Sequence, residues 1–202
     1  MNDNKAEKAW LRKRGLADRR RVSVRGHRIA AREIAEWAPE FKRLAQRGTI
    51  SCFFSFGDEL DTAPLISELT RCGCRLALPV VTGRGKPLTF RRWAPGDPMR
   101  AGAFGIREPL DTAPEEAPLV ILVPLLSFDA RGYRIGYGGG FYDRTLAAAR
   151  ADRRIAAIGL AFSCQEVGRV PTDRYDQPVD GVLTERGLLT CSGGARAAAL
   201  SW

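Results

Sequence analysis

The stretch Leu119-Val-Ile-Leu-Val-Pro-Leu125, followed by Arg134-Ile-Gly-Tyr-Gly-Gly-Gly-Phe-Tyr-Asp-Arg144, decides the fold of this chain. The first segment is almost continuously apolar, which predicts a strand buried on both faces of a parallel sheet. The second is a glycine-rich turn with a cation at each end, and a helix is predicted over 141–150. Such sheets bind ligands beyond the carboxyl ends of their strands, which is where the glycine turn falls.

Apolar segments alternate with helical segments along the rest of the chain. This alternation predicts an α/β fold, a three-layer sandwich with a mainly parallel central sheet flanked by helices. In the first helix, Trp10 and Leu11 are expected on one side. The predicted helices are 5–20, 24–47, one that begins at Asp61-Thr-Ala-Pro64, and 141–150; the predicted strands are 49–56, 75–81, 88–93, 119–125 and 155–162, with short edge strands at 182–183 and 188–190.

Length and charge narrow the class of protein. With 202 residues and 45% hydrophobic content, the chain can bury a full core, and we expect 1–202 to form one domain. The net charge of +9 arises largely from the basic segment 5–47, which includes Arg19-Arg20-Arg21. We interpret most of these cations as a solvated helical face. The tail 192–202 matches no motif.

The chain lacks the sequence patterns of membrane and secreted proteins. No stretch approaches the roughly 18 apolar residues of a membrane helix, and Met1-Asn-Asp-Asn-Lys5 does not have the pattern of a signal peptide. Five scattered cysteines without a CxxC pair, and a single histidine, argue against structural zinc. We therefore expect a soluble, cytoplasmic protein with reduced thiols.

The glycine turn has the composition of a phosphate site. Glycines let consecutive N–H groups converge on oxyanions, and Asp143 could hold a hard cation against them. The spacing fits neither standard nucleotide fingerprint, because the turn lacks a terminal Gly-Lys-Ser/Thr and Phe141 stands where a dinucleotide turn has its last glycine. A tight structural connection is the competing interpretation.

A longer pattern favours phosphate chemistry. The stretch 123–144 resembles the signature of the 5-formyltetrahydrofolate cyclo-ligase family, also called methenyltetrahydrofolate synthetases. The resemblance covers about 5–185 and includes four weaker segments: Lys8-Ala-Trp-Leu-Arg12, Ser55-Phe-Gly-Asp-Glu-Leu-Asp-Thr62, Gly102-Ala-Phe-Gly-Ile-Arg-Glu-Pro109 and Pro171-Thr-Asp-Arg-Tyr-Asp-Gln-Pro-Val-Asp180. It implies an architecture shared with sugar-phosphate isomerases and CoA-transferases. The implied reaction is the ATP-dependent cyclisation of 5-formyltetrahydrofolate to 5,10-methenyltetrahydrofolate, with magnesium present.

The resemblance also assigns residues to ATP. Lys8 and Arg12 are four apart, so they project from one helical face and could grip one anion. Arg134 and Asp143 are the expected catalytic residues, with Arg134 stabilising charge on the transferred phosphoryl group. The full set implied for ATP is Lys8, Arg12, Arg134, Ile135, Gly136, Tyr137, Gly138, Gly139, Gly140, Phe141 and Tyr142.

The resemblance places magnesium on two carboxylates, Asp143 and Asp176. Mg²⁺ usually takes one or two protein carboxylates, so two suffice. Family members often have His before the second aspartate, whereas this chain has Tyr175, and Asp173 and Asp180 compete for the role of Asp176.

The folate side of the site is also implied by the resemblance. Glu59 matches a folate-contacting glutamate, whose carboxylate could accept bidentate hydrogen bonds from the pterin. The other substrate contacts are Tyr137, Gly138, Gly139, Gly140 and Phe141, where aromatic rings could stack on the folate. A first-turn glutamate and a core phenylalanine are the structural alternatives for Glu59 and Phe141. The 105–109 turn is interpreted as structural support.

Two other classes of function stay open. One is a phosphate-binding enzyme on a similar scaffold, such as a sugar-phosphate isomerase or a CoA-transferase relative, since a fold does not fix an activity. The other is a basic nucleic-acid-binding module, but the sequence has no RNP, KH or zinc-finger pattern. We therefore expect ATP and a folate, including polyglutamylated forms, as partners, with no nucleic acid or membrane, and we expect a monomer.

Overall fold

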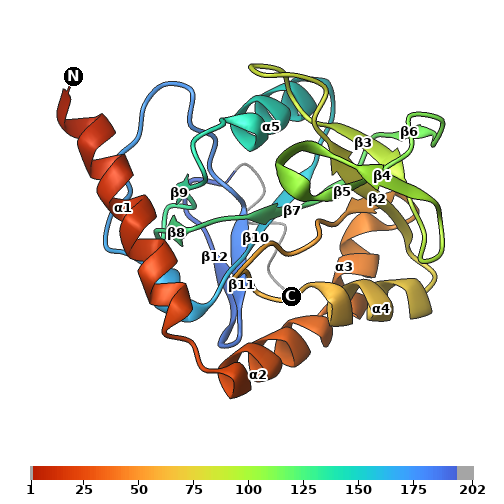
Figure 1. Ribbon diagram of the computed structural model, residues 1–202, viewed down its shortest axis with the longest axis horizontal. Coiled ribbons are helices and arrows are strands. Elements are labelled where there is room, and N and C mark those ends of the chain that lie inside the picture. Colours follow the sequence, from red (N-terminus) through yellow and green to blue (C-terminus); the bar gives the residue numbers. More distant parts are fainter. Residues whose placement is uncertain (1, 195–202) are drawn as a thin grey trace.

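The computed structural model describes residues 2–194, so most of the predicted tail 192–202 lies outside the described residues (Figure 1). The helices are α1 (Asn2–Arg20), α2 (Val24–Ala35), α3 (Ala38–Ala45), α4 (Ala63–Arg71) and α5 (Phe141–Asp152), with 3₁₀ turns η1 (Ala103–Gly105) and η2 (Ser163–Gln165). The strands are β1 (Thr49–Ser51), β2 (Arg75–Val80), β3 (Thr89–Arg92), β4 (Met99–Ala101), β5 (Arg107–Pro109), β6 (Glu115–Glu116), β7 (Val120–Pro124), β8 (Ser127–Phe128), β9 (Arg134–Ile135), β10 (Ala156–Leu160), β11 (Gly181–Thr184) and β12 (Gly187–Thr190). None of the helices in this range is both long and apolar enough to span a membrane.

Eight of the strands form one sheet in the order β12-β11-β10-β7-β1-β2-β3-β6. The pairs among β11, β10, β7, β1 and β2 are parallel, and the outer pairs are antiparallel. The apolar strand β7 lies near the centre, where it pairs with both β1 and β10. The prediction of a mainly parallel sheet is therefore confirmed.

Helices cover both faces of this sheet, which confirms the three-layer prediction (Figure 1). Alternate residues of β7 point to opposite faces. Leu122 joins the core cluster that also contains Ile34 of α2 and Leu65 of α4. Ile121 joins the second cluster, which contains Leu146 of α5. Thus α2, α3 and α4 pack on one face and α5 on the other.

Several predicted boundaries are wrong. The single helix predicted over 24–47 is two helices, because Pro39 lies in the first turn of α3 and cannot continue the helix that ends at Ala35. Trp10 is 56% exposed and lies beside the guanidinium of Arg14, while Leu11 is buried, so the two do not share a side. The predicted edge strand at 182–183 is β11, which is buried between β10 and β12.

The strand predicted over 49–56 ends at Ser51 for a local reason. The N–H of Cys52 donates to the carbonyl of Ala77 in β2. Beyond Cys52, polar side chains donate hydrogen bonds to backbone carbonyls of the segment itself. The hydroxyl of Thr62 donates to the carbonyl of Phe53, and the hydroxyl of Ser55 donates to the carbonyl of Leu60. The segment 53–62 is therefore a loop braced by its own side chains, at the carboxyl end of β1.

The hairpin β8–β9 was not predicted from the sequence, and it positions the glycine turn. Its residues pair Ser127 with Ile135 and Phe128 with Arg134. Between the two strands the buried carboxylate of Asp129 accepts hydrogen bonds from the backbone of Arg131 and Tyr133. Helix α1 lies beside this hairpin and η2. Their contact buries Leu11, Leu126, Ile135 and Val170.

Candidate active site

The glycine turn at 136–140 joins β9 to the first turn of α5. Gly138 has φ 97° and Gly140 has φ 63°, backbone conformations that residues with a Cβ rarely adopt. Gly140 immediately precedes the N-terminus of α5. The free N–H groups and the positive end of the helix dipole make this position favourable for anions. Gly138 and Gly139 are exposed, so a ligand can approach the backbone.

A group of charged side chains lies at one end of the turn; we call Lys8, Arg134, Asp143, Asp173 and Asp176 the acidic cluster. Lys8 Nζ is 2.8 Å from Asp173 Oδ2 and 2.6 Å from Asp176 Oδ2. Arg134 Nη2 is 2.9 Å from Asp143 Oδ1. These contacts bring α1, β9, α5 and the loop before β11 together.

The backbone of Gln177 connects the two halves of the acidic cluster. Its N–H donates to Asp143 Oδ1 at 3.2 Å, and its carbonyl accepts a hydrogen bond from Arg134. Since Gln177 directly follows Asp176, the two predicted magnesium ligands lie in one small region. The resemblance to the cyclo-ligase family placed them in one site, and the geometry is compatible with that expectation.

The ionisation of the acidic cluster reflects its ion pairs. Burial lowers the pKa of Arg134, while the neighbouring Asp143 opposes that shift. Burial also acts to lower the pKa of Lys8, but hydrogen bonds to Asp173 and Asp176 outweigh it, so that pKa is raised. The hydrogen bond from Lys8 lowers the pKa of Asp173. These shifts favour the charged forms of Lys8 and Asp173, whereas burial acts against the charged form of Arg134.

Arg12 lies above the turn itself. Its Nε donates to the carbonyl of Gly136 at 3.0 Å. A Cβ placed on Gly138 would lie 3.6 Å from the guanidinium of Arg12. Lys8 and Arg12 therefore project from one face of α1 to neighbouring parts of the site, as their spacing predicts.

A second group, which contains a buried ion pair, lies at the other end of the turn; we call Arg19, Glu59 and Tyr137 the Glu59 cluster. The hydroxyl of Tyr137 donates to Glu59 Oε1 at 2.6 Å, and Arg19 Nη2 donates to that hydroxyl at 2.9 Å. Arg19 Nη1 lies 3.7 Å from Glu59 Oε1. Burial and the hydrogen bond to Glu59 raise the pKa of Tyr137 to about 12, so its hydroxyl stays protonated.

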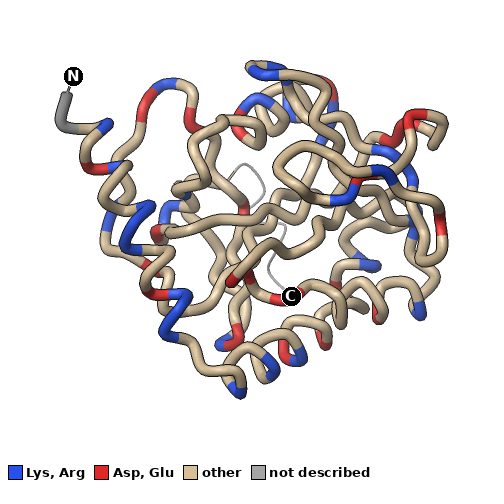
Figure 2. The backbone as a smooth tube through the Cα atoms, in the orientation of Figure 1, with Lys and Arg blue, Asp and Glu red and all other residues tan. Residues whose placement is uncertain are grey.

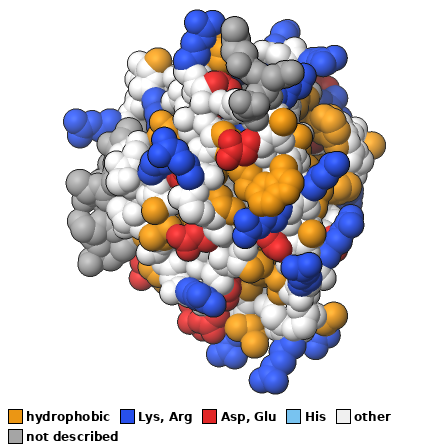
Figure 3. All heavy atoms as spheres, turned by 90° about the vertical axis from the view of Figure 1, so that its left-hand side faces the viewer, with side chains coloured by type: hydrophobic (Ala, Val, Ile, Leu, Met, Phe, Trp, Pro, Cys, Tyr) orange, Lys and Arg blue, Asp and Glu red, His pale blue; other side chains and the backbone are white. Residues whose placement is uncertain are grey.

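The buried position of Arg19 is an exception to the interpretation of most cations of the basic segment as a solvated face. Its side chain is only 3% exposed, whereas Arg20 and Arg21 are exposed. Lys and Arg recur along α1 (Figure 2). On the face that carries α1, these cations are mixed with acidic and apolar side chains (Figure 3). A signal was present in the sequence, since Arg19 follows Lys8 and Arg12 by about three and two helical turns and so shares their face.

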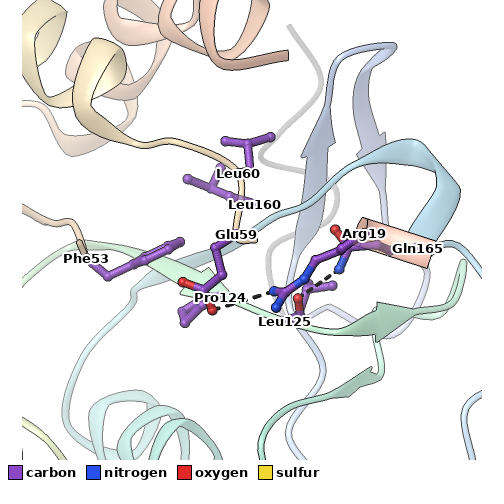
Figure 4. A pocket seen from close by; sticks show the side chains of 8 residues that line it. All are labelled: Arg19, Phe53, Glu59, Leu60, Pro124, Leu125, Leu160 and Gln165. Atoms are coloured by element: carbon purple, nitrogen blue, oxygen red, sulfur yellow. Dashed lines mark hydrogen bonds and ion pairs between the residues drawn. The ribbon is translucent and has the colours of Figure 1, made fainter. Parts of the chain in front are cut away.

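The Glu59 cluster borders a small cavity at the carboxyl ends of β1, β7 and β10 (Figure 4). Arg19 and Glu59 point toward each other across it. The cavity encloses ≈ 10 Å³, close to the least that holds one water molecule. It is lined by Arg19, Phe53, Glu59, Leu60, Pro124, Leu125, Leu160 and Gln165.

Three predicted ATP contacts differ in what they can offer. Ile135 is buried beneath α1, so only its backbone remains for a ligand. Tyr142 packs on the core cluster under α5, and burial raises its pKa. Phe141 is half-buried, with its ring centroid 6.3 Å from that of Phe104 and 5.4 Å from the guanidinium carbon of Arg144.

Asp180 does not belong to the acidic cluster, which removes one of the competitors of Asp176. It is fully buried beneath β10, where Oδ2 accepts hydrogen bonds from the backbone of Ala157 at 2.7 Å and from Arg150 at 3.2 Å. Asp173 and Asp176 both contact Lys8 and so both stay in the site. Within 2–194, no group of three or more His, Cys, Asp or Glu side chains could hold a metal.

The remaining sequence motif, 102–109, packs beside β2. Glu108 is buried, its Oε1 accepts the backbone N–H of Val81 at 3.2 Å, and Arg100 lies 3.6 Å from its other oxygen. A Cβ on Gly102 would lie 2.3 Å from the Glu108 side chain, so this position requires glycine. These contacts agree with the interpretation of the segment as structural support.

The fold and the site together define the class: an α/β enzyme with a glycine turn, of a kind that favours anions, at the carboxyl edge of a parallel sheet. Comparison with known proteins gives the family. The chain belongs to the 5-formyltetrahydrofolate cyclo-ligase family, which it matches over residues 4–185.

Individual relatives agree with this assignment. The 5-formyltetrahydrofolate cyclo-ligase of Escherichia coli K12 is 38% identical over 141 residues, 67% of this chain and 77% of the relative. That of Mycolicibacterium smegmatis is 32% identical over 193 residues, 90% of this chain and 96% of the relative. The solved structure of Aquifex aeolicus 5,10-methenyltetrahydrofolate synthetase superposes with a TM-score of 0.74 at 29% identity, covering 91% of this chain and 92% of that one.

Proposed function

We propose that this enzyme cyclises 5-formyltetrahydrofolate to 5,10-methenyltetrahydrofolate, with conversion of ATP to ADP and phosphate. One observation carries the proposal. The glycine turn has the acidic cluster at one end and, through Tyr137, the Glu59 cluster at the other. A triphosphate on the turn and a folate at Glu59 would therefore meet at the same few residues. Membership of the cyclo-ligase family supports this assignment.

The chemistry requires two substitutions. The formyl oxygen attacks the γ-phosphorus, so an oxygen–phosphorus bond forms while the bond to ADP breaks. The N10 amine then attacks the formyl carbon, and the phosphate leaves with the oxygen as N10 loses its proton. Phosphoryl transfer depends mainly on alignment and charge stabilisation, and the anion-binding turn and its cations provide both.

The residues take the following roles in this proposal. The backbone N–H groups of 136–141, together with Lys8 and Arg12, bind the triphosphate, and Arg134 stabilises the charge of the transferred group. Glu59 accepts hydrogen bonds from the pterin. The rings of Tyr137 and Phe141 offer surfaces on which the folate can stack.

Asp143 and Asp176 fit a magnesium site. Within the described range, the hydrogen bonds of Asp143 fall on Oδ1 and those of Asp176 on Oδ2, so each carboxylate has its other oxygen to offer. Three aspartates face two cations in the acidic cluster, an excess of negative charge that suits a divalent cation. Bound there, Mg²⁺ would neutralise charge on the phosphates.

The proposal extends to the setting of the enzyme. We treat 1–202 as one domain and the enzyme as a cytoplasmic monomer, which fits its five free cysteines. The net charge of +9 would attract the acidic tail of polyglutamylated folates. Equal affinity for mono- and polyglutamate forms would contradict this expected attraction of the tail.

A direct assay tests the function. The enzyme is incubated with 5-formyltetrahydrofolate and Mg-ATP, and the near-ultraviolet absorbance of the methenyl product is followed alongside ADP. We expect one ADP per product and no product without ATP. A sugar-phosphate isomerase would need no ATP, so turnover of a sugar phosphate in the absence of nucleotide, with no methenyl product, would reject the proposal.

A further inference from the structure

Both oxygens of Glu59 already accept hydrogen bonds in this structure. Oε1 takes the hydroxyl of Tyr137 at 2.6 Å, and Oε2 takes the backbone N–H of Phe56 at 3.0 Å. The side chain is 8% exposed. A folate that presents two N–H donors to this carboxylate therefore meets a competitor, the Tyr137 hydroxyl, on one of the two oxygens.

Tyr137 is well placed to move away. Its side chain is 52% exposed. It stands between Gly136 and Gly138 in the glycine turn, and a Cβ on Gly136 would meet nothing within 4 Å. Glycine on both sides gives the backbone a wide choice of conformations. The hydroxyl can therefore leave Glu59 by a local change in the turn, without a change in the core.

Arg19 is held in place instead. Its side chain is 3% exposed and lies on α1, which is anchored by the buried Leu11 and the partly buried Leu16. Its Nε is buried and has no acceptor among the described residues. Leaving such a donor unpaired is costly, and Arg19 lines the cavity next to Glu59. Arg19 is thus a fixed cation whose Nε can still donate a hydrogen bond.

The geometry points to a latch: the Tyr137 hydroxyl occupies the hydrogen-bonding position on Glu59 that the pterin takes, and it leaves when the folate binds, while Arg19 stays as the counter-ion of the carboxylate. This inference rests on the proposed function. Because Tyr137 belongs to the glycine turn, release of the latch changes the turn that binds the triphosphate. Arg19 is a positioning residue in this scheme, and Tyr137 connects the two substrates.

Two substitutions have opposite expected effects on folate affinity. Tyr137→Phe keeps the ring and removes the competing hydroxyl, so the Kd for 5-formyltetrahydrofolate should fall about three- to tenfold, the scale of the net contribution of one hydrogen bond. Arg19→Gln removes the counter-ion and should raise that Kd about tenfold or more. Arg19→Lys retains the charge and should recover part of the loss.

The matched control is Arg20→Gln. Arg20 is the next residue on α1 and pairs with Asp58, the neighbour of Glu59, at 3.3 Å, but its side chain is 70% exposed. Surface pairs of this kind contribute little, so the folate Kd should stay unchanged. Thermal melting of each variant identifies any loss of folding, and Tyr137→Phe decides the latch even if Arg19→Gln does not fold.

Binding is measured calorimetrically for folate and for ATP, beside the turnover assay. Tighter folate binding by Tyr137→Phe, weaker binding by Arg19→Gln and partial rescue by Arg19→Lys would support the latch. Equal or weaker folate binding by Tyr137→Phe, in an enzyme whose wild type makes the methenyl product, would overturn the latch alone. A wild type that neither binds 5-formyltetrahydrofolate nor makes product would overturn the proposed function and the latch together.

Discussion

The two ends of the glycine turn differ in their charge balance and in their exposure to solvent. The acidic cluster has three carboxylates and two cations, and Asp173, Asp143 and Asp176 are 48%, 28% and 21% exposed. The Glu59 cluster has one carboxylate and one cation, 8% and 3% exposed. One end carries unbalanced charge open to solvent, and the other is balanced and closed.

This difference indicates what each end receives. Solvated, unbalanced carboxylates can accept charge that a ligand brings, such as a metal with its phosphates. A buried, neutralised carboxylate can discriminate between neutral hydrogen-bond donors, because an unpaired polar group is costly there. The predictions below test this contrast, beginning with the change that should abolish the function of one end.

The largest effect is expected at the Arg134–Asp143 pair, 2.9 Å apart. Arg134→Ala and Asp143→Asn should each lower kcat by two to three orders of magnitude, about 3–4 kcal/mol in transition-state stabilisation. Folate affinity should stay near that of the wild type, because the Glu59 cluster is untouched. Steady-state and single-turnover kinetics separate the effect on kcat from the effect on folate binding. A near-normal kcat in either variant would contradict the assigned roles.

The second prediction concerns α1, which supplies residues to both ends. A Cβ on Gly15 would lie 2.2 Å from the carbonyl oxygen of Leu126, a backbone atom that cannot turn aside. Gly15→Ala should therefore displace α1, cost about 1–3 kcal/mol of stability, and weaken binding of both substrates. Calorimetric melting and titrations of ATP and folate measure this.

Gly168→Ala is the matched control, since a Cβ there meets nothing within 4 Å. Its melting temperature should equal that of the wild type. If Gly15→Ala bound only one substrate less tightly, α1 would not act on both ends of the turn.

The sequence predicted the strand, turn and helix around 119–150 because their signals are local. Continuous apolar character, glycine spacing and helical periodicity all lie within one segment. The same holds for Lys8 and Arg12, whose shared face follows from helix geometry alone. The break at Pro39 was also visible in the sequence, and the predicted helix 24–47 ignored it.

Other features depend on partners far along the chain. Helical spacing places Arg19 on the face of Lys8 and Arg12, but its partner Tyr137 lies 118 residues away, so its burial could not be predicted from that spacing. Strands of two residues, such as β8 and β9, are too short to show alternation. Asp173, Asp176 and Asp180 look alike in sequence, and only the fold separates the buried Asp180 from the other two.

The third prediction tests whether the acidic cluster acts on ATP alone. The ammonium group of Lys8 pairs with Asp173 and Asp176 of the acidic cluster. Lys8→Ala should raise the KM for ATP about tenfold, the scale of one lost charge-assisted contact, and leave folate affinity unchanged. Initial rates with each substrate varied in turn provide the measurement. An unchanged KM for ATP would place the triphosphate away from Lys8.

The smallest effect is expected from pH, and it concerns how α1 docks on the acidic cluster. The pKa of Asp173 is lowered from 3.8 by the hydrogen bond from Lys8. A lowered pKa means that the contact stabilises the fold above the usual aspartate range and loses this contribution as pH falls through the lowered value. Acidification below about 3.8 should therefore increase amide hydrogen exchange in the first half of α1, corrected for intrinsic rates.

The increase should be small, because Asp173 is half exposed and water and salt screen its ion pair. Asp173→Asn provides the control, since it removes the titrating group and should blunt the acid response while Asp176 still holds Lys8. An acid response of equal size in Asp173→Asn would show that this end of α1 is held mainly by Leu11 and its apolar partners. The contrast between an open, charge-dependent end and a closed one would then apply to ligand binding and not to the docking of the helix.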